Sequence, residues 1–300
     1  MNNNDRAGNS YPLYITLVLL INLLITMTSS RFVSFYFGSS GSVFYDCLKL
    51  LLPAAAKCLG LSAALALIRS AVGFDFRVTE LLKPVRFSPL LLPVLPSVIL
   101  AAGIGAKLLF LVFDRLGIHL YSADIIYANK SITVYAVYFL TVVIIPAVVE
   151  EVLFRGAVMQ ILSPPLGDKN ALITQAVLFG MIHCHPEKIP YAIAGGLFLG
   201  YVRMKSNSLF PAIILHAVSN GMFYILTVFD SYDTFTTLFA LAIFTFGVLC
   251  LFFLIKSGYF RKIKGIYPNE SESLATFWSY PPMFVYTAVI LILIIGYFYI

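Results

Sequence analysis

Long apolar segments follow one another along the chain, separated by short polar stretches. Several contain about 18 residues or more, which is enough for a helix to cross a hydrocarbon layer of about 30 Å. The pattern predicts an all-α, polytopic bundle of transmembrane helices with about nine spans, counted as eight to nine. The spans are expected at about 11–28, 42–68, 88–113, 131–162, 170–185, 189–204, 208–229, 234–256 and 282–300.

The composition favours an integral membrane protein. Hydrophobic residues make up 60% of the 300 residues and charged residues 11%, and the mean hydropathy is +0.92. A soluble globular domain carries about 25% charged residues. The sequence Gly-Leu-Phe-Leu-Gly at 196–200 is a GxxxG pattern, which predicts close contact with another helix.

The basic residues predict an orientation, because cytoplasmic loops of membrane proteins are rich in Lys and Arg. With the N-terminus in the cytoplasm, 13 of the 20 basic residues lie on or near the cytoplasmic side, 4 lie on the other side and 3 lie within spans. We therefore expect a multi-pass protein of the plasma membrane with its N-terminus cytoplasmic and its C-terminus outside. We therefore interpret the net charge of +6 as a sign of orientation. No pattern of basic and aromatic residues predicts a groove that binds nucleic acid.

Ionisable residues inside predicted spans need a partner, an escape route to the interface or a function. Asp46 and Lys49 are three residues apart on one predicted helix and can neutralise each other. Lys57 and Lys107 have no partner in the local sequence, and a long lysine side chain can reach toward an interface. We expect these four residues to be structural.

A second set of polar residues lies at similar predicted depth on three spans. At 1.5 Å per helical residue, each of them falls near the middle of the bilayer. The sequence therefore predicts that they meet inside the membrane. They are Glu150, Glu151 and Arg155 on the fourth predicted span, His183 on the fifth, and His216 and Asn220 on the seventh.

Helical spacing separates the roles of these residues. Glu150 and Glu151 point about 100° apart and cannot share one role. Glu151 and Arg155 are four residues apart with the acid first, which favours an ion pair and leaves Glu150 as the free carboxylate. His216 and Asn220 are also four residues apart and share one helix face.

Three motifs in order resemble those of a known family, the CAAX protease and bacteriocin-processing (CPBP) intramembrane proteases. This family, also called Abi, includes the type II CAAX prenyl endopeptidases. Its EExxxR motif is similar to Glu150–Arg155, its FxxxH motif to Phe179–His183 and its HxxxN motif to His216–Asn220. The resemblance implies a catalytic core over 131–229, between N-terminal transmembrane helices with a cytoplasmic loop over 1–130 and C-terminal transmembrane helices over 230–300.

The resemblance implies an intramembrane endopeptidase whose partners are membrane lipids and a peptide or membrane-protein substrate. That substrate is a prenylated protein in some branches of the family and a bacteriocin-like peptide in others. Glu150 with His183 could activate water, and His216 with Asn220 could donate to the oxyanion. Glu151, Arg155 and Phe179 are the expected supporting residues, with Phe179 forming an apolar wall beside His183.

Other functions stay open at this point. Buried Glu and His residues also form the relay of a proton-coupled transporter, although no inverted repeat is evident. A non-proteolytic immunity or scaffold protein is a third interpretation. Cleavage of a candidate substrate would distinguish the protease from both.

The cofactor also stays open. Glu150, His183 and His216 could be the three protein ligands of a catalytic zinc. However, Asn220 is a poor zinc ligand, and pairing of Glu151 with Arg155 leaves no evident carboxylate to orient a zinc-bound histidine. We therefore expect water activation without a metal, with zinc as the alternative.

Overall fold

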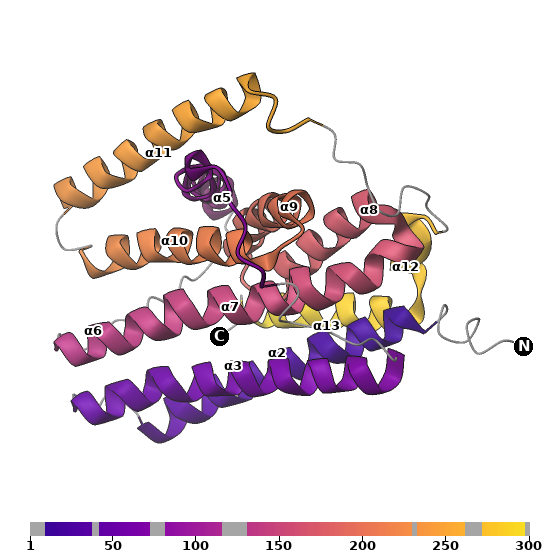
Figure 1. Cartoon of the computed structure of the whole chain (residues 1–300). Helices are drawn as coiled ribbons and strands as arrows, with labels where there is room; N and C mark the ends of the chain where they lie inside the picture. The colour runs from indigo at the N-terminus through magenta and orange to yellow at the C-terminus, as the bar shows by residue number, and fades with distance from the viewer. Residues whose placement is uncertain are drawn as a thin grey trace, which may run out of the picture.

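A computed structural model describes residues 10–37, 42–72, 82–115, 131–229, 233–261 and 272–297. Within these ranges all regular structure is helical, as predicted (Figure 1). The α-helices are α2 (Tyr11–Phe37), α3 (Val43–Val72), α5 (Val94–Arg115), α6 (Ile132–Phe139), α7 (Ile145–Glu151), α8 (Met159–Met181), α9 (Lys188–Ser206), α10 (Leu209–Val228), α11 (Asp233–Lys256), α12 (Leu274–Ser279) and α13 (Pro281–Tyr297). The other helices are the short 3₁₀-helix η1 (Pro89–Leu91) and the π-helices η2 (Leu140–Ile144) and η3 (Val152–Val158).

In the described part of the chain, 6 helical stretches are long and apolar enough to cross a membrane. They are Tyr11–Ser29, Val43–Ser70, Pro89–Arg115, Ile132–Met181, Leu209–Val228 and Thr234–Lys256, with a shorter apolar helix at Pro281–Gly296. The predicted bundle of transmembrane helices is therefore confirmed. The predicted span 170–185 is not a separate stretch here, and α9, predicted as span 189–204, is not among the 6. The count of nine stays a prediction.

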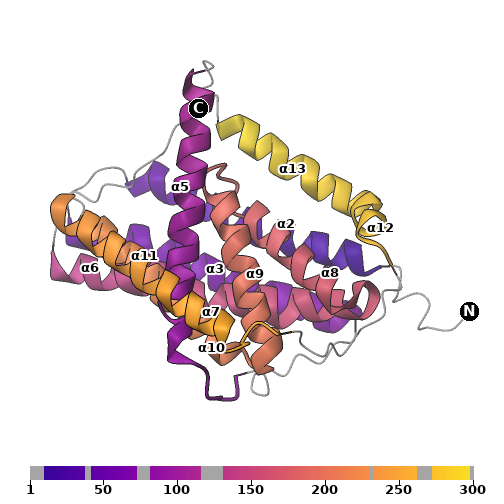
Figure 2. The same cartoon turned by 90° about the horizontal axis from the view of Figure 1, so that it is seen from above.

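The 50-residue stretch Ile132–Met181 is bent at Gly167. Gly167 has φ 72° and ψ 156°, a conformation that glycine adopts without a Cβ clash, and Pro164 and Pro165 lie just before it. After this bend α8 turns back across the bundle (Figure 2). Its remaining residues up to Met181 span about 21 Å, less than the roughly 30 Å of a full crossing.

The helices are arranged around the long stretch made by α6, η2, α7 and η3. The antiparallel pair α2 and α3 packs along one side of this stretch and α10 along the other (Figure 1). Helices α5 and α9 cross above them, α11 packs on α5, and α13 packs on α2 (Figure 2). The glutamates at the end of α7 are thus enclosed between α3 and α10.

The GxxxG pattern of α9 packs against α8, as predicted. A Cβ atom on Gly196 would lie 3.0 Å from the Cα and Cβ of Ala176, and one on Gly200 would lie 2.5 Å from Leu172 Cδ1. Only glycine allows the two helix backbones to approach so closely.

At one end of the bundle, contacts hold together segments that are distant in the sequence. The Tyr11 hydroxyl donates to Glu272 Oε2 at 2.7 Å, and the Glu272 amide donates to the Pro165 carbonyl at 3.0 Å. Burial, and then the Glu272 carboxylate, raises the pKa of Tyr280, whose hydroxyl donates to Glu272 Oε1. The segments that carry Tyr11, Pro165 and Glu272 are all predicted to be cytoplasmic, so their meeting at one end agrees with the predicted alternation. The side of the membrane on which this end lies stays a prediction.

Candidate active site

Two π-helices flank the adjacent glutamates. η2 (Leu140–Ile144) precedes α7 and η3 (Val152–Val158) follows it, so Glu150 and Glu151 end the short α-helix between them. Pro146, the second residue of α7, has no backbone N–H to donate. π-Helical turns alter the direction of side chains along a helix and occur frequently at functional sites.

Glu151 binds two partners through one oxygen. Its Oε1 accepts a hydrogen bond from Arg155 Nη1 at 2.7 Å, and both side chains are fully buried, so the predicted ion pair is confirmed. The same Oε1 lies 2.8 Å from His216 Nδ1, which donates to it. The expectation that Arg155 occupies Glu151 entirely was therefore wrong, because one carboxylate oxygen can accept two hydrogen bonds.

Phe179 lies at the centre of the buried residues. The Arg155 guanidinium lies 4.4 Å from the centre of the Phe179 ring, and its Nη2 donates to the Gly196 carbonyl at 3.3 Å. The ring contacts His183 edge-on at 5.1 Å and His216 at 6.1 Å between centroids. Phe179 thus forms the apolar wall that the sequence predicts, and it touches both histidines.

Glu150 is not a free carboxylate. Its Oε1 accepts a hydrogen bond from Lys57 Nζ on α3 at 2.7 Å, and its Oε2 lies 3.8 Å from His216 Nε2. The local sequence offers Lys57 no partner, and the structure supplies one from another helix. The signal was present, because a lysine inside a span needs an acid and Glu150 was the unpaired acid.

His183 lies in a turn and not on a helix. α8 ends at Met181, and α9 begins at Lys188, so the predicted placement of His183 on a helical span was wrong. Cys184, the next residue, has φ 53°, which a right-handed helix cannot include. His183 Nδ1 donates to the Phe179 carbonyl at 2.7 Å, which leaves Nε2 free to face water or substrate.

Asn220 lies on α10, one turn after His216, as its spacing predicts. Its side chain is partly exposed. No hydrogen bond joins it to the residues that the structure describes, so its amide is available to a ligand. Its role as an oxyanion donor stays a prediction.

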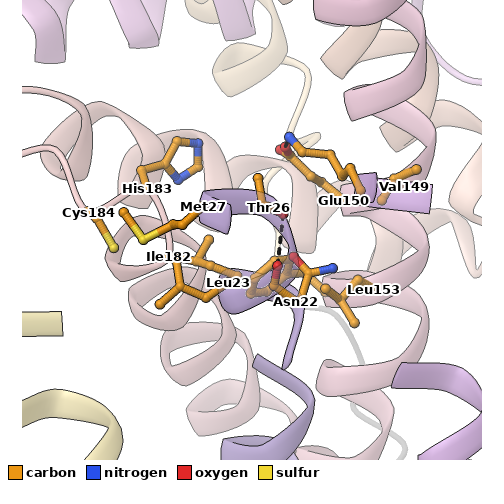
Figure 3. A pocket seen from close by; sticks show the side chains of 12 residues that line it. Asn22, Leu23, Thr26, Met27, Val149, Glu150, Leu153, Ile182, His183 and Cys184 are labelled. Carbon is orange, nitrogen blue, oxygen red and sulfur yellow. Dashed lines mark hydrogen bonds and ion pairs between the residues drawn. The ribbon is translucent and has the colours of Figure 1, made fainter. Parts of the chain in front are cut away.

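Glu150, Lys57 and His183 open into one cavity of about 330 Å³, which we call the site cavity (Figure 3). Glu150 and His183 lie on different sides of it in this view, and Met27 and Thr26 of α2 lie between them. The walls are mostly apolar. The remaining lining residues are Asn22, Leu23, Thr26, Met27, Val149, Leu153, Phe154, Ile182 and Cys184.

The charges of the site balance. Lys57 and Arg155 carry two positive charges, and Glu150 and Glu151 carry two negative charges. With both histidines neutral, the buried group has no net charge, which is the state that an apolar environment favours.

The residues that the structure describes are not grouped as a three-ligand metal site. His183 and His216 each have Nδ1 hydrogen-bonded to an oxygen, as zinc-binding histidines do. However, no three His, Cys, Asp or Glu side chains within the described ranges are grouped so as to hold a metal ion. The Lys57 ammonium also lies against Glu150, where a metal cation would compete with it.

Residues 132–222 match the family model described as type II CAAX prenyl endopeptidase Rce1-like. This range contains both glutamates, Arg155, both histidines of the site and Asn220. This segment of the chain is therefore similar to the type II CAAX prenyl endopeptidases of the Rce1-like family. The match and the apolar helices together support an integral membrane protein and, in general terms, a peptidase of the CAAX type.

Comparison with curated proteins and with solved structures gives no match. Lys57 and the residues of α2 that line the site cavity lie outside the Rce1-like segment. The N-terminal helices therefore supply a part of the site that the family segment does not contain.

Proposed function

We propose that the chain is an intramembrane endopeptidase in which Glu150 activates the water that hydrolyses a peptide bond. One observation carries this proposal: Glu150 and His183 line the same cavity, and Glu150 Oε2 lies 3.8 Å from His216 Nε2. A base and one imidazole thus line a partly enclosed space inside the bundle, and a second imidazole lies beside the base without lining that space.

In the proposed reaction His183 Nε2 helps to hold a water molecule, and Glu150 Oε2 takes a proton from that water. The water oxygen attacks the carbonyl carbon of the peptide bond and forms a tetrahedral oxyanion. The protonated Glu150 then gives its proton to the leaving nitrogen, the C–N bond breaks, and a carboxylic acid and an amine are released. Glu150 returns to its ionised form, so the step balances without a further reactant.

His216 and Asn220 are proposed to stabilise the oxyanion from the face of α10. This role requires the imidazolium form of His216, in which Nδ1 donates to Glu151 and Nε2 donates to the substrate oxygen. With that proton the buried group carries one positive charge while both glutamates are ionised, and this excess favours formation of the negative oxyanion. Glu151 and Arg155 fix the orientation of His216, because both are buried and bound to each other.

A peptide or a membrane protein is the proposed substrate, and it would enter from the bilayer or from the cytoplasmic side. A prenylated C-a-a-X sequence and a bacteriocin-like peptide are the two substrate types to compare. Leu23, Met27 and Ile182 give the site cavity an apolar wall that suits an aliphatic side chain of either substrate. We further propose a plasma-membrane location with the N-terminus cytoplasmic and the C-terminus outside.

A test of this function uses purified protein in liposomes and three peptides: a farnesylated C-a-a-X peptide, the same peptide without the lipid, and a bacteriocin-leader peptide. Mass spectrometry of the products should show cleavage of at least one peptide by the wild type and of none by Glu150→Gln. A pH-sensitive dye in the same liposomes reports proton flux. Glu150-dependent flux without cleavage of any peptide would favour a transporter instead.

A further inference from the structure

Lys57 is held against the proposed base by a helix outside the Rce1-like segment. Its Nζ lies 2.7 Å from Glu150 Oε1, although the two residues are 93 positions apart in the sequence. Lys57 therefore leaves one carboxylate oxygen anchored and the other, Oε2, directed toward His216 Nε2.

We propose that Lys57 is a positioning residue that anchors Oε1 of Glu150 and thereby makes Oε2 the oxygen that takes the proton from water. This inference rests on the proposed function. A carboxylate that rotates freely presents either oxygen to the water, whereas an anchored one keeps a single oxygen in line with the substrate. Misplacement of a reacting group by about 1 Å can cost about 10²-fold in rate.

The exposure of the two ion pairs separates their roles. The Glu151–Arg155 pair is sealed, with both side chains 0% exposed, as a structural pair should be. The Lys57–Glu150 pair opens into the site cavity, and its side chains are 25% and 16% exposed. A pair used only for stability gains nothing from facing a cavity, because water there weakens its attraction.

Charge balance gives a second reason for Lys57. With His216 in the imidazolium form that the proposed reaction requires, the buried group carries one positive charge, to which Lys57 contributes. Loss of the Lys57 charge would remove this excess positive charge from the place where the oxyanion forms. Its loss opposes the transition state more than it opposes binding of a neutral peptide. Loss of Lys57 should therefore lower kcat and leave KM nearly unchanged.

The experiment measures kcat and KM for peptide cleavage in liposomes with Lys57→Met, Lys57→Arg and the control Lys107→Met. Lys107 is an exposed lysine of α5 within an apolar span and has no ion pair with a described residue. We expect Lys57→Met to lower kcat about 100-fold with KM changed less than about 3-fold, Lys57→Arg to keep most of kcat, and Lys107→Met to match the wild type. If Lys57→Met gives no folded protein, Lys57→Gln takes its place in the comparison.

Rescue of the charge provides an independent readout. Lys57→Cys is alkylated with 2-bromoethylamine, which rebuilds an ammonium group of nearly the same length, and treated wild type controls for reaction at the other cysteines. Recovery of kcat by at least about 10-fold is expected. Wild-type kcat in Lys57→Met, or no recovery on alkylation, would overturn the role of Lys57 while Glu150→Gln remained inactive. Full activity in Glu150→Gln would instead overturn the proposed function itself.

Discussion

The two ring nitrogens of His216 lie near different glutamates. Nδ1 lies 2.8 Å from Glu151 Oε1, and Nε2 lies 3.8 Å from Glu150 Oε2. The first contact is a buried hydrogen bond that fixes the ring, and the second is too long for a hydrogen bond, so both atoms can contact a ligand atom beside them. The adjacent glutamates therefore act on one histidine in two ways, which their 100° separation on a helix allows.

Arg155→Ala should destabilise the protein and not merely inactivate it. The variant leaves Glu151 ionised and fully buried without its cation, and such a loss costs about 3–5 kcal/mol. The exposed Arg69 at the end of α3 is the matched control, because Arg69→Ala removes the same charge from a solvated position. Thermal unfolding in detergent should show a clearly lower midpoint for Arg155→Ala alone. Equal midpoints for both variants would show that the buried pair is not structural.

Local spacing made some of these contacts predictable and left others hidden. Glu151 and Arg155 lie one helical turn apart, so the sequence alone predicts their ion pair. Lys57 and Glu150 are brought together by the packing of α3 on α7, which no local pattern contains. The second hydrogen bond of Glu151, to His216 on α10, depends on packing in the same way.

The turn between α8 and α9 places His183 where a continuous helix would not. Its backbone irregularity is tolerated because it lines the site cavity, where polar groups can be solvated. Pro186 is the signal that could have located this end of the helix, since proline disfavours helical conformation in the residue before it. The hydrophobic pattern continues past Met181 and therefore predicts a longer helix than the chain forms.

Substitution of Gly196 should separate α9 from α8. A Cβ there would lie 3.0 Å from Ala176 Cα, which is backbone and cannot move aside. Gly196→Val should therefore lower the free energy of unfolding by about 1–3 kcal/mol, the usual cost of overpacking. The displacement of α9 from α8 should also weaken the hydrogen bond from Arg155 to the Gly196 carbonyl.

Gly105→Val is the control for this prediction, because a Cβ on Gly105 would meet nothing within 4 Å. Both variants add the same side chain to a helix of the bundle. Denaturation in mixed micelles should show that the free energy of unfolding falls more for Gly196→Val than for Gly105→Val. Equal losses would mean that the close approach of the two helices adds no stability.

At the scale of the whole molecule, the ends of several helices that meet through Glu272 define one side of the bundle. The Lys205 side chain also donates to the Tyr259 carbonyl, which joins the end of α9 to the segment after α11. These are segments that the distribution of basic residues assigns to the cytoplasm.

Reporter fusions made after Lys205 and after Glu272 should therefore both report the cytoplasm. A fusion after Asp114, at the far end of α5, should report the opposite side. Protease protection of the same fusions gives an independent reading. A signal from opposite sides for Lys205 and Glu272 would contradict the predicted topology.

The central claim is that Glu150 is the base of a peptidase site built inside the bundle. The most direct measurement is kcat for cleavage by Glu150→Gln, beside Asp46→Asn as control. Asp46 is also a buried acid of the bundle and lies 3.5 Å from a lysine, but it is paired within its own helix and does not line the site cavity. We predict a loss of kcat of about 10²-fold to 10⁴-fold for Glu150→Gln and wild-type kcat for Asp46→Asn. Unchanged kcat in folded Glu150→Gln would contradict the account.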